Sequence, residues 1–173
     1  MAVEIERKFL VISDAWRAGP PGVVMRQGYL TAGGGAGATV RVRLIGSGDS
    51  VCGRITIKGP ASRATAGPGL GGAPVRDEFE YEIPGVDADH MLRTLCDGRL
   101  VEKVRSERMY GGMTWEVDEF SGANAGLVIA EVELDHADQR VELPPWVGRE
   151  VTDDPRYANS SLAVRPITDA RGG

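Results

Sequence analysis

Residues 3–9, VEIERKF, alternate between apolar and charged side chains with the two-residue period of a β-strand. An extended chain places the apolar side chains on one face, together with Arg7. The other face then carries Glu4, Glu6 and Lys8 in a row. Two carboxylates and an ammonium group on one side of a strand raise the question of what that side contacts.

The same alternation recurs along the chain, and it repeatedly puts charged or polar side chains two residues apart on one face. The segments are VRVRL (40–44), ITIK (55–58), FEYEI (79–83), EKVRSER (102–108), WEVDEF (115–120) and IAEVEL (129–134). An ordinary sheet with one face in water explains any single segment. The series is harder to explain in that way, because its paired charges are mostly of the same sign.

Paired like charges need a compensating partner once they are enclosed. Same-face neighbours on a strand lie about 6.5–7 Å apart, where like charges repel by roughly 2–3 kcal/mol at an effective dielectric of about 20. A divalent cation relieves paired carboxylates, and phosphate relieves paired arginines, which bind it with two parallel hydrogen bonds. An eight-stranded barrel has room inside for one small ligand. The pattern therefore predicts a lumen that binds a polyphosphate together with its metal.

Alternation and turn residues predict eight strands connected largely by hairpins, which indicates an antiparallel sheet. The predicted strands are residues 2–11, 22–31, 38–46, 51–58, 77–84, 100–109, 113–120 and 128–134. Gly111 and Gly112 suit a two-residue primed turn. The predicted fold is α+β, mainly antiparallel β: one domain over residues 1–173, an eight-stranded closed barrel with a few flanking helices.

Few segments have the pattern of a helix. Residues 86–98 are the best, with Asp87 as the expected N-cap and an apolar stripe of Met91, Leu92 and Leu95. Short helices are also predicted in residues 13–19 and 153–165, the latter beginning at Pro155. Two glycine-rich segments, residues 31–39 and 59–74, lack the ending of a phosphate-binding P-loop, so they are expected to be hairpin loops.

Composition excludes several classes of function. A net charge of −5 does not favour nucleic acid as a partner, and the chain has no apolar run long enough to span a membrane. The two cysteines provide neither a disulfide framework nor a metal-binding spacing, and we expect a cytoplasmic protein. With two histidines in the chain, a metal would be held by carboxylates, which favours Mg²⁺ or Mn²⁺.

Taken in order, the charged motifs resemble those of the CYTH family, the triphosphate tunnel metalloenzymes. The matching elements are EIERK (4–8), RVR (41–43), TIK (56–58), EFEYEI (78–83), EKVR (102–105), Asp118, EVE (131–133) and RYANSSLA (156–163). The resemblance covers nearly the whole chain. It implies an eight-stranded antiparallel tunnel that acts on triphosphates with Mg²⁺ or Mn²⁺.

The resemblance also implies roles for individual residues. The implied metal ligands are Glu4, Glu6, Asp118, Glu131 and Glu133. The implied phosphate-binding residues are Lys8, Arg41, Arg43, Lys58, Lys103 and Arg105. Lys103 is also placed in the catalytic group, with Glu80, Glu82 and Tyr29: one of the two glutamates binds a second metal or orients water, and Tyr29 partners Lys8. An ordinary aromatic position on a strand explains Tyr29 equally well.

Three enzymatic activities follow from the resemblance, and hydrolysis of the terminal phosphoryl group of inorganic triphosphate ranks first. Thiamine triphosphatase and class IV adenylate cyclase are the alternatives, and Trp16, Trp115 and Trp146 are candidate platforms for an organic group. An alternative of another class is a non-catalytic polyphosphate- or nucleotide-binding module. Five carboxylates argue against it, because pure binding would rely on the basic residues. The resemblance also allows a homodimer.

Overall fold

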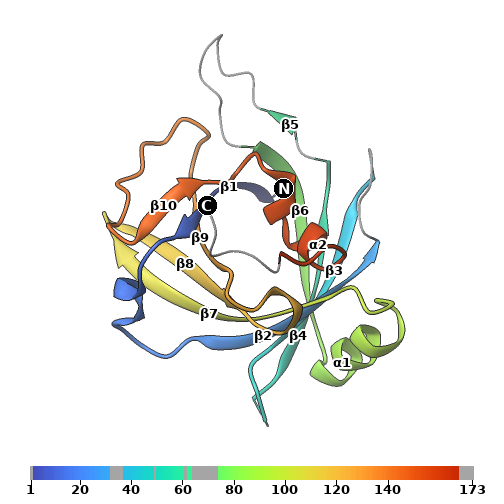
Figure 1. Cartoon of the computed structure of the whole chain (residues 1–173). Helices are drawn as coiled ribbons and strands as arrows, with labels where there is room; N and C mark the ends of the chain where they lie inside the picture. The colour runs from blue at the N-terminus through green and yellow to red at the C-terminus, as the bar shows by residue number, and fades with distance from the viewer. Residues whose placement is uncertain (1, 32–36, 49, 61, 64–73, 168–173) are drawn as a thin grey trace.

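A closed β-barrel dominates the computed structural model, which describes residues 2–31, 37–48, 50–60, 62–63 and 74–167 (Figure 1). Within these residues, eight antiparallel strands form a ring in the order β1-β9-β8-β7-β2-β3-β4-β6, and β1 pairs with β6 to close it. The ring strands are β1 (Ala2–Val11), β2 (Val23–Thr31), β3 (Thr39–Ile45), β4 (Cys52–Lys58), β6 (Pro74–Ile83), β7 (Leu100–Tyr110), β8 (Met113–Phe120) and β9 (Val128–Glu133). Each corresponds to a predicted strand, so the predicted fold class is confirmed.

Strand β1 completes the ring by pairing along both of its edges. One edge pairs with β9 through residues 6–10. The other edge pairs with β6 through residues 2–5 and, near its end, with β10 (Val147–Glu150). Closure removes the unpaired strand edges that an open sheet would expose. A two-residue strand, β5 (Ser62–Arg63), pairs with the start of β6 and is not part of the ring.

The connection between β7 and β8 matches its prediction, whereas most of the two glycine-rich connections lies outside the described residues. Gly111 and Gly112 have φ of 57° and 77°, as the predicted primed turn between β7 and β8 requires. Strands β5 and β10 were not predicted, and β6 begins at Pro74 rather than at residue 77. Residues 32–36 and 64–73, the larger part of the two glycine-rich segments, lie outside the described residues.

The main helix, α1 (Gly85–Thr94), packs on the outer face of β3 and β4 (Figure 1). Ala88 and Leu92 form its buried face, and Cys96, just beyond the end of the helix, joins them in one cluster. The predicted stripe is partly wrong: Leu92 is buried and Met91 packs against this cluster, but Leu95 is 54% exposed. The predicted N-cap is also wrong, since Pro84 holds that position and Asp87 lies in the first turn.

Short helices form in both remaining predicted segments. Helix η1 (Asp14–Arg17) follows β1 as predicted, and η2 (Gly122–Asn124), which was not predicted, follows β8. Near the end of the described chain, η3 (Pro155–Tyr157) begins at Pro155 as predicted, and the Asp154 side chain accepts a hydrogen bond from the Arg156 backbone amide. Helix α2 (Asn159–Leu162) follows. No helix of the described chain is long and apolar enough to cross a membrane.

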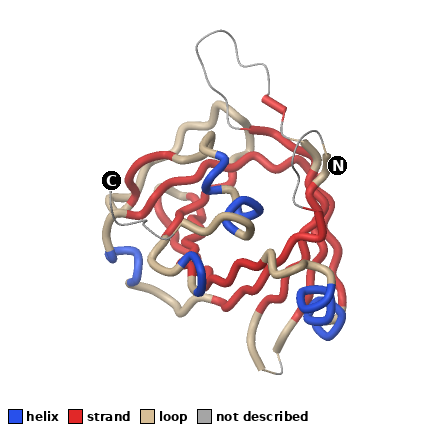
Figure 2. Tube along the Cα trace, turned by 45° about the vertical axis from the view of Figure 1, so that its right-hand side comes forward, coloured by secondary structure: helices blue, strands red, loops and turns tan. Residues whose placement is uncertain are grey.

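Apolar side chains gather in three clusters, and their positions explain how the lumen stays polar. One cluster, around Trp115 and Trp146, covers the outer face of β1, β8 and β9, and another lies beneath α1. The third lies at one end of the lumen, where Val101, Phe120 and Ile129 meet Tyr157 and Leu162 of the C-terminal segment. We call this third cluster the apolar plug. The short helices of the C-terminal segment, residues 155–162, lie across the barrel opening (Figure 2). Charged side chains line the lumen beyond the plug.

Candidate active site

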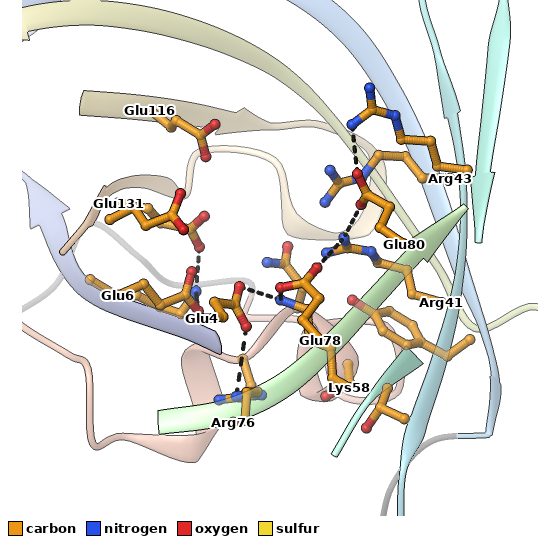
Figure 3. A pocket seen from close by; sticks show the side chains of 18 of the residues that line it. Glu4, Glu6, Arg41, Arg43, Lys58, Arg76, Glu78, Glu80, Glu116 and Glu131 are labelled. Carbon is orange, nitrogen blue, oxygen red and sulfur yellow. Dashed lines mark hydrogen bonds and ion pairs between the residues drawn. The ribbon is translucent and has the colours of Figure 1, made fainter. Parts of the chain in front are cut away.

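A charged cavity of about 330 Å³ lies inside the barrel (Figure 3). All eight ring strands point side chains into it, and residues 158–160 of the C-terminal segment complete its wall. The lining charged and aromatic residues are Glu4, Glu6, Lys8, Tyr29, Arg41, Arg43, Arg54, Lys58, Arg76, Glu78, Glu80, Arg105, Glu116, Glu131 and Glu133. Every site residue that the resemblance implies is among them except Lys103, Asp118 and Glu82.

The three exceptions lie on the expected faces of their strands but at different depths. Lys103 and Asp118 have fully buried side chains, with Nζ of Lys103 2.5 Å from Oδ2 of Asp118. Lys103 also lies against the apolar plug, 5.6 Å from the Phe120 ring centroid and 3.4 Å from Oδ1 of Asn159. Glu82 lies at the other extreme: its side chain is 80% exposed and reaches Arg54 at 3.6 Å.

Four charged lining residues were not singled out from the sequence, although some signal for each was present. Arg54 shares the inward face of β4 with Lys58, and Glu116 precedes Asp118 by two residues on β8. The remaining two, Arg76 and Glu78, precede Glu80 on β6. Arg76 was missed because the predicted strand started at residue 77, after it.

Lys8 and Glu131 form the centre of the wall made by β1 and β9. Nζ of Lys8 lies 2.8 Å from Oε1 of Glu6 and 2.5 Å from Oε1 of Glu131. Burial opposes the charge on Lys8, but Glu131 and Glu6 outweigh it and raise the Lys8 pKa. Burial likewise opposes the charge on Glu131, but Lys8 and Arg105 outweigh it and hold the Glu131 pKa well below its usual range. Both groups therefore stay charged at neutral pH.

Arg105 is held by carboxylates from two neighbouring strands. Its Nε and Nη2 donate to the two oxygens of Asp118 at 2.7 and 2.6 Å, and Nη2 also donates to Glu131 at 2.8 Å. Its Nη1 donates to Glu116. Burial raises the pKa of Glu116, and this outweighs the opposing effect of Arg105. Arg105 therefore has two roles: it links β7 to carboxylates of β8 and β9, and it also lines the cavity.

Arg41 and Arg43 are neighbouring buried cations, and Arg43 is the less compensated of the two. Arg41 donates to the Thr56 hydroxyl at 2.9 Å and lies 3.6 Å from Oε2 of Glu80 and 3.9 Å from Oε1 of Glu78. Arg43 donates through Nε to Oε1 of Gln27 at 3.1 Å, and no carboxylate of the described chain lies within ion-pair distance of it. Burial, followed by the neighbouring Arg41 and Arg105, lowers the Arg43 pKa to about 10. Two adjacent buried guanidinium groups fit an anion.

Glu4 lies between two cations at the opposite side of the cavity (Figure 3). It forms an ion pair with Lys58, and its Oε2 is 3.8 Å from Nε of Arg76. Lys58 also approaches Oε2 of Glu78 at 3.5 Å. Oε2 of Glu4 is nevertheless buried without a hydrogen-bond partner.

The acidic side of the cavity fits a divalent cation. In addition to the unpartnered oxygen of Glu4, burial and the charges of Glu4, Glu116 and Glu6 raise the pKa of Glu133. Negative charge is therefore in excess around Glu133, and the donors are oxygens of the kind that Mg²⁺ and Mn²⁺ prefer. In the described part of the chain, no three such side chains are yet gathered around a single point, because Lys8 and Lys58 hold several of them.

A second cavity of about 870 Å³ adjoins the first and shares Arg43, Arg54, Arg105 and Glu116 with it. Its other walls are largely apolar and include Val23, Met25, Ile45, Met109, Trp16 and Trp146. The two tryptophans are only 4% and 6% exposed. The Arg17 guanidinium also lies over the Trp16 ring, 4.5 Å from the ring centroid, in a cation–π contact. Trp115, the third candidate platform, is buried in the outer cluster.

Comparison with known proteins matches this geometry to a family. The CYTH domain matches residues 2–165. An inorganic triphosphatase of Acetivibrio thermocellus is 42% identical over 166 residues, covering 96% of each chain. Another, of Nitrosomonas europaea, is 36% identical over 168 residues, covering 93% of this chain and 97% of the relative. A solved structure of an inorganic triphosphatase aligns with a TM-score of 0.64 at 32% identity, covering 96% of this chain and 99% of the other. The chain belongs to the CYTH domain family.

Proposed function

We propose that this protein is a divalent-metal-dependent triphosphatase that removes the terminal phosphoryl group of inorganic triphosphate. The observation that carries the proposal is the division of charge within one enclosed cavity. On one side the buried Arg43 has no carboxylate partner in the described chain, and on the other side Glu133 lies among the like charges of Glu4, Glu116 and Glu6. The inorganic triphosphatases among its relatives support the same substrate.

The basic residues are proposed to bind the substrate. Both terminal nitrogens of Arg43 remain available for phosphate oxygens, since only Nε is occupied by Gln27. Arg41, Lys58 and Lys8 line the same cavity and are further candidate donors to phosphate oxygens. Phosphoryl transfer depends mostly on positioning and on electrostatic stabilisation, and fixed cations in an enclosed cavity supply both.

The acidic residues are proposed to hold the metal. A bound Mg²⁺ or Mn²⁺ would neutralise charge on the substrate oxygens. Glu4, Glu6 and Glu133 are the first ligands that we propose, since one Glu4 oxygen is unpartnered and Glu133 lies among like charges. Glu131 and Asp118 reach a metal only by giving up contacts to Arg105. We therefore assign Asp118 to holding Arg105 and Lys103.

The groups around the reacting end have defined protonation states. Burial raises the Tyr29 pKa to about 12, against the opposing charges of Arg41, Arg43 and Lys8, so the hydroxyl keeps its proton at neutral pH. Tyr29 and Lys8 are thus hydrogen-bond donors to charge that develops on phosphate oxygens. Glu80 stays our candidate for orienting the attacking water because it lines the cavity. Glu82 is too exposed for that role.

A substrate panel tests the proposal. Inorganic triphosphate, thiamine triphosphate and ATP are each incubated with Mg²⁺ and with Mn²⁺, and phosphate, pyrophosphate and cyclic AMP are measured. We expect phosphate release from inorganic triphosphate that stops when the metal is chelated. Glu119→Gln is the matched control, because Glu119 lies on the outer face of β8 and pairs with Arg17. Tight triphosphate binding without phosphate release would instead indicate a binding module.

The second cavity favours one alternative, hydrolysis of an organic triphosphate. Its apolar walls adjoin the charged cavity, so an organic group attached to a bound triphosphate has a place to lie. The platform for an aromatic ring is poor, however, because Trp16 and Trp146 are almost fully covered. Inorganic triphosphate is therefore the first candidate. Faster release from thiamine triphosphate or ATP in the same panel would reverse this order.

A further inference from the structure

Gln27 lies behind the cavity wall that carries Arg43, and its side chain contacts both Arg43 and Tyr29. It is a β2 residue with no exposed surface, and it does not line the cavity. Its Nε2 lies 2.9 Å from the Tyr29 hydroxyl, and its Oε1 lies 3.1 Å from Nε of Arg43. The β2–β3 register places Gln27 directly opposite Arg43.

The direction of both hydrogen bonds follows from the chemistry of the partners. An arginine guanidinium only donates, so the amide oxygen of Gln27 must face Arg43. The amide nitrogen then faces Tyr29 and donates to its hydroxyl oxygen. As a result the Tyr29 proton is free to be donated elsewhere, and both terminal nitrogens of Arg43 stay free for the cavity.

We propose that Gln27 is a positioning residue that directs the hydrogen bonds of Tyr29 and Arg43 toward the bound triphosphate. The inference rests on the proposed function, because it assumes a triphosphate in the charged cavity. Gln27 acts through the two side chains that it contacts and does not itself reach the ligand. Its neutrality is part of the role: a carboxylate at this place would accept from both partners, withdraw the Tyr29 proton and compensate the charge of Arg43.

Arg41 shows that this arrangement is particular to Arg43. Arg41 donates to the Thr56 hydroxyl, and Thr56 in turn donates to Glu80 at 3.0 Å, so Arg41 is linked to a carboxylate. Arg43 has only the neutral amide. Of the two arginines, Arg43 therefore has the positive charge that is less compensated by carboxylates. Gln27 holds the Arg43 side chain in place through a neutral amide, which leaves that charge uncompensated.

Gln27→Glu tests the proposal, since it keeps the size of the side chain and changes only its hydrogen bonding and charge. Unfolding in urea checks the fold, calorimetry without metal gives the Kd for inorganic triphosphate, and steady-state kinetics with Mg²⁺ give kcat and KM. We expect a folded protein whose Kd rises and whose kcat falls, each by about tenfold or more. Gln27→Met, which keeps the length without polar atoms, replaces it if the first variant does not fold.

A double-mutant cycle with Tyr29→Phe separates positioning from general damage. We expect Tyr29→Phe to lower kcat by about tenfold in the parent but by less than about threefold beside Gln27→Glu, because the Tyr29 proton is already withdrawn there. Asn124→Ser is the matched control: this buried amide binds Leu162 and Ile167 near the plug. We expect it to lower stability and to leave Kd and kcat within about twofold.

Two results would overturn the proposal. One is a Kd and a kcat that stay within about twofold of the parent in Gln27→Glu, or in Gln27→Met where that variant replaces it. The other is a Tyr29→Phe effect of equal size in both backgrounds. A parent protein that binds triphosphate without releasing phosphate contradicts the proposed function instead, and the Kd comparison still tests Gln27 in that case.

Discussion

The Arg105 guanidinium and the Asp118 carboxylate form a bidentate ion pair, with Nε–Oδ1 and Nη2–Oδ2 distances of 2.7 and 2.6 Å. Asp118 is fully buried and also accepts from Lys103 at 2.5 Å. Its charge therefore compensates two cations that the wall would otherwise enclose unpaired. Burial lowers the Lys103 pKa to about 7, and Asp118 opposes that effect.

Removing the charge of Asp118 is accordingly expected to destabilise the fold. We predict that Asp118→Asn lowers the free energy of unfolding by about 3–5 kcal/mol, the usual cost of breaking a buried pair from one side. Urea unfolding without metal measures it. A variant that keeps its stability and loses only affinity for Mg²⁺ would show that Asp118 is a metal ligand, as the sequence resemblance implies.

Glu133 is expected to behave in the opposite way. Burial, followed by the charges of Glu4, Glu116 and Glu6, raises its pKa, so its charge is unfavourable when no cation is bound. Because the side chain is partly open to solvent, we predict a small gain in metal-free stability for Glu133→Gln, on the order of 0.5 kcal/mol. The same change should weaken Mg²⁺ binding. Thermal melts over a Mg²⁺ titration measure both, since a ligand of the folded state raises Tm.

Acid should unfold the protein through its buried carboxylates. The pKa values of Glu131 and Asp118 in the folded protein lie below their unfolded values, so the unfolded chain binds protons first as the pH falls. Their contribution to stability is present in full above the unfolded pKa values, near pH 4, and is lost as the pH falls through the lower folded values. Urea unfolding from pH 6 to pH 3 should show the loss, with a shallower slope in Glu131→Gln. A free energy of unfolding that stays level to pH 3 would contradict this account.

The barrel was predictable because alternation fixes both the strands and their faces. Glu4, Glu6 and Lys8 line the cavity as the opening stretch indicates, and Arg41 and Arg43 lie where their strand predicts. The apolar faces pack outward, as a polar lumen requires.

Depth along the lumen was not predictable from alternation. Lys103 and Arg105 share the inward face of β7, yet one is enclosed beside the apolar plug and the other lines the cavity. The difference depends on Tyr157, Asn159 and Leu162, which reach the barrel from the far end of the chain. Local sequence does not contain that packing. Strand β10 was not predicted for a similar reason: it is only four residues long, and it is a strand because it pairs with the end of β1.

Glu4 and Glu6 allow metal binding to be separated from folding. Each pairs with a lysine that has another carboxylate nearby: Lys58 approaches Glu78 at 3.5 Å, and Lys8 lies 2.5 Å from Glu131. The double variant Glu4→Gln/Glu6→Gln should therefore stay folded, unlike Asp118→Asn. It removes two of the three proposed metal ligands, so we predict a loss of Mg²⁺-dependent phosphate release of about 100-fold or more, equivalent to about 2.7 kcal/mol in the barrier.

Phosphate release from inorganic triphosphate, measured over a range of Mg²⁺ concentrations, tests the effect of the double variant. Glu119→Gln, on the outer face of β8, controls for the loss of a carboxylate elsewhere. Activity that recovers at high Mg²⁺ would indicate weakened metal binding, the expected cause. Full activity at every Mg²⁺ concentration would place the metal elsewhere, because a cation held by other residues would not respond to the loss of these two charges.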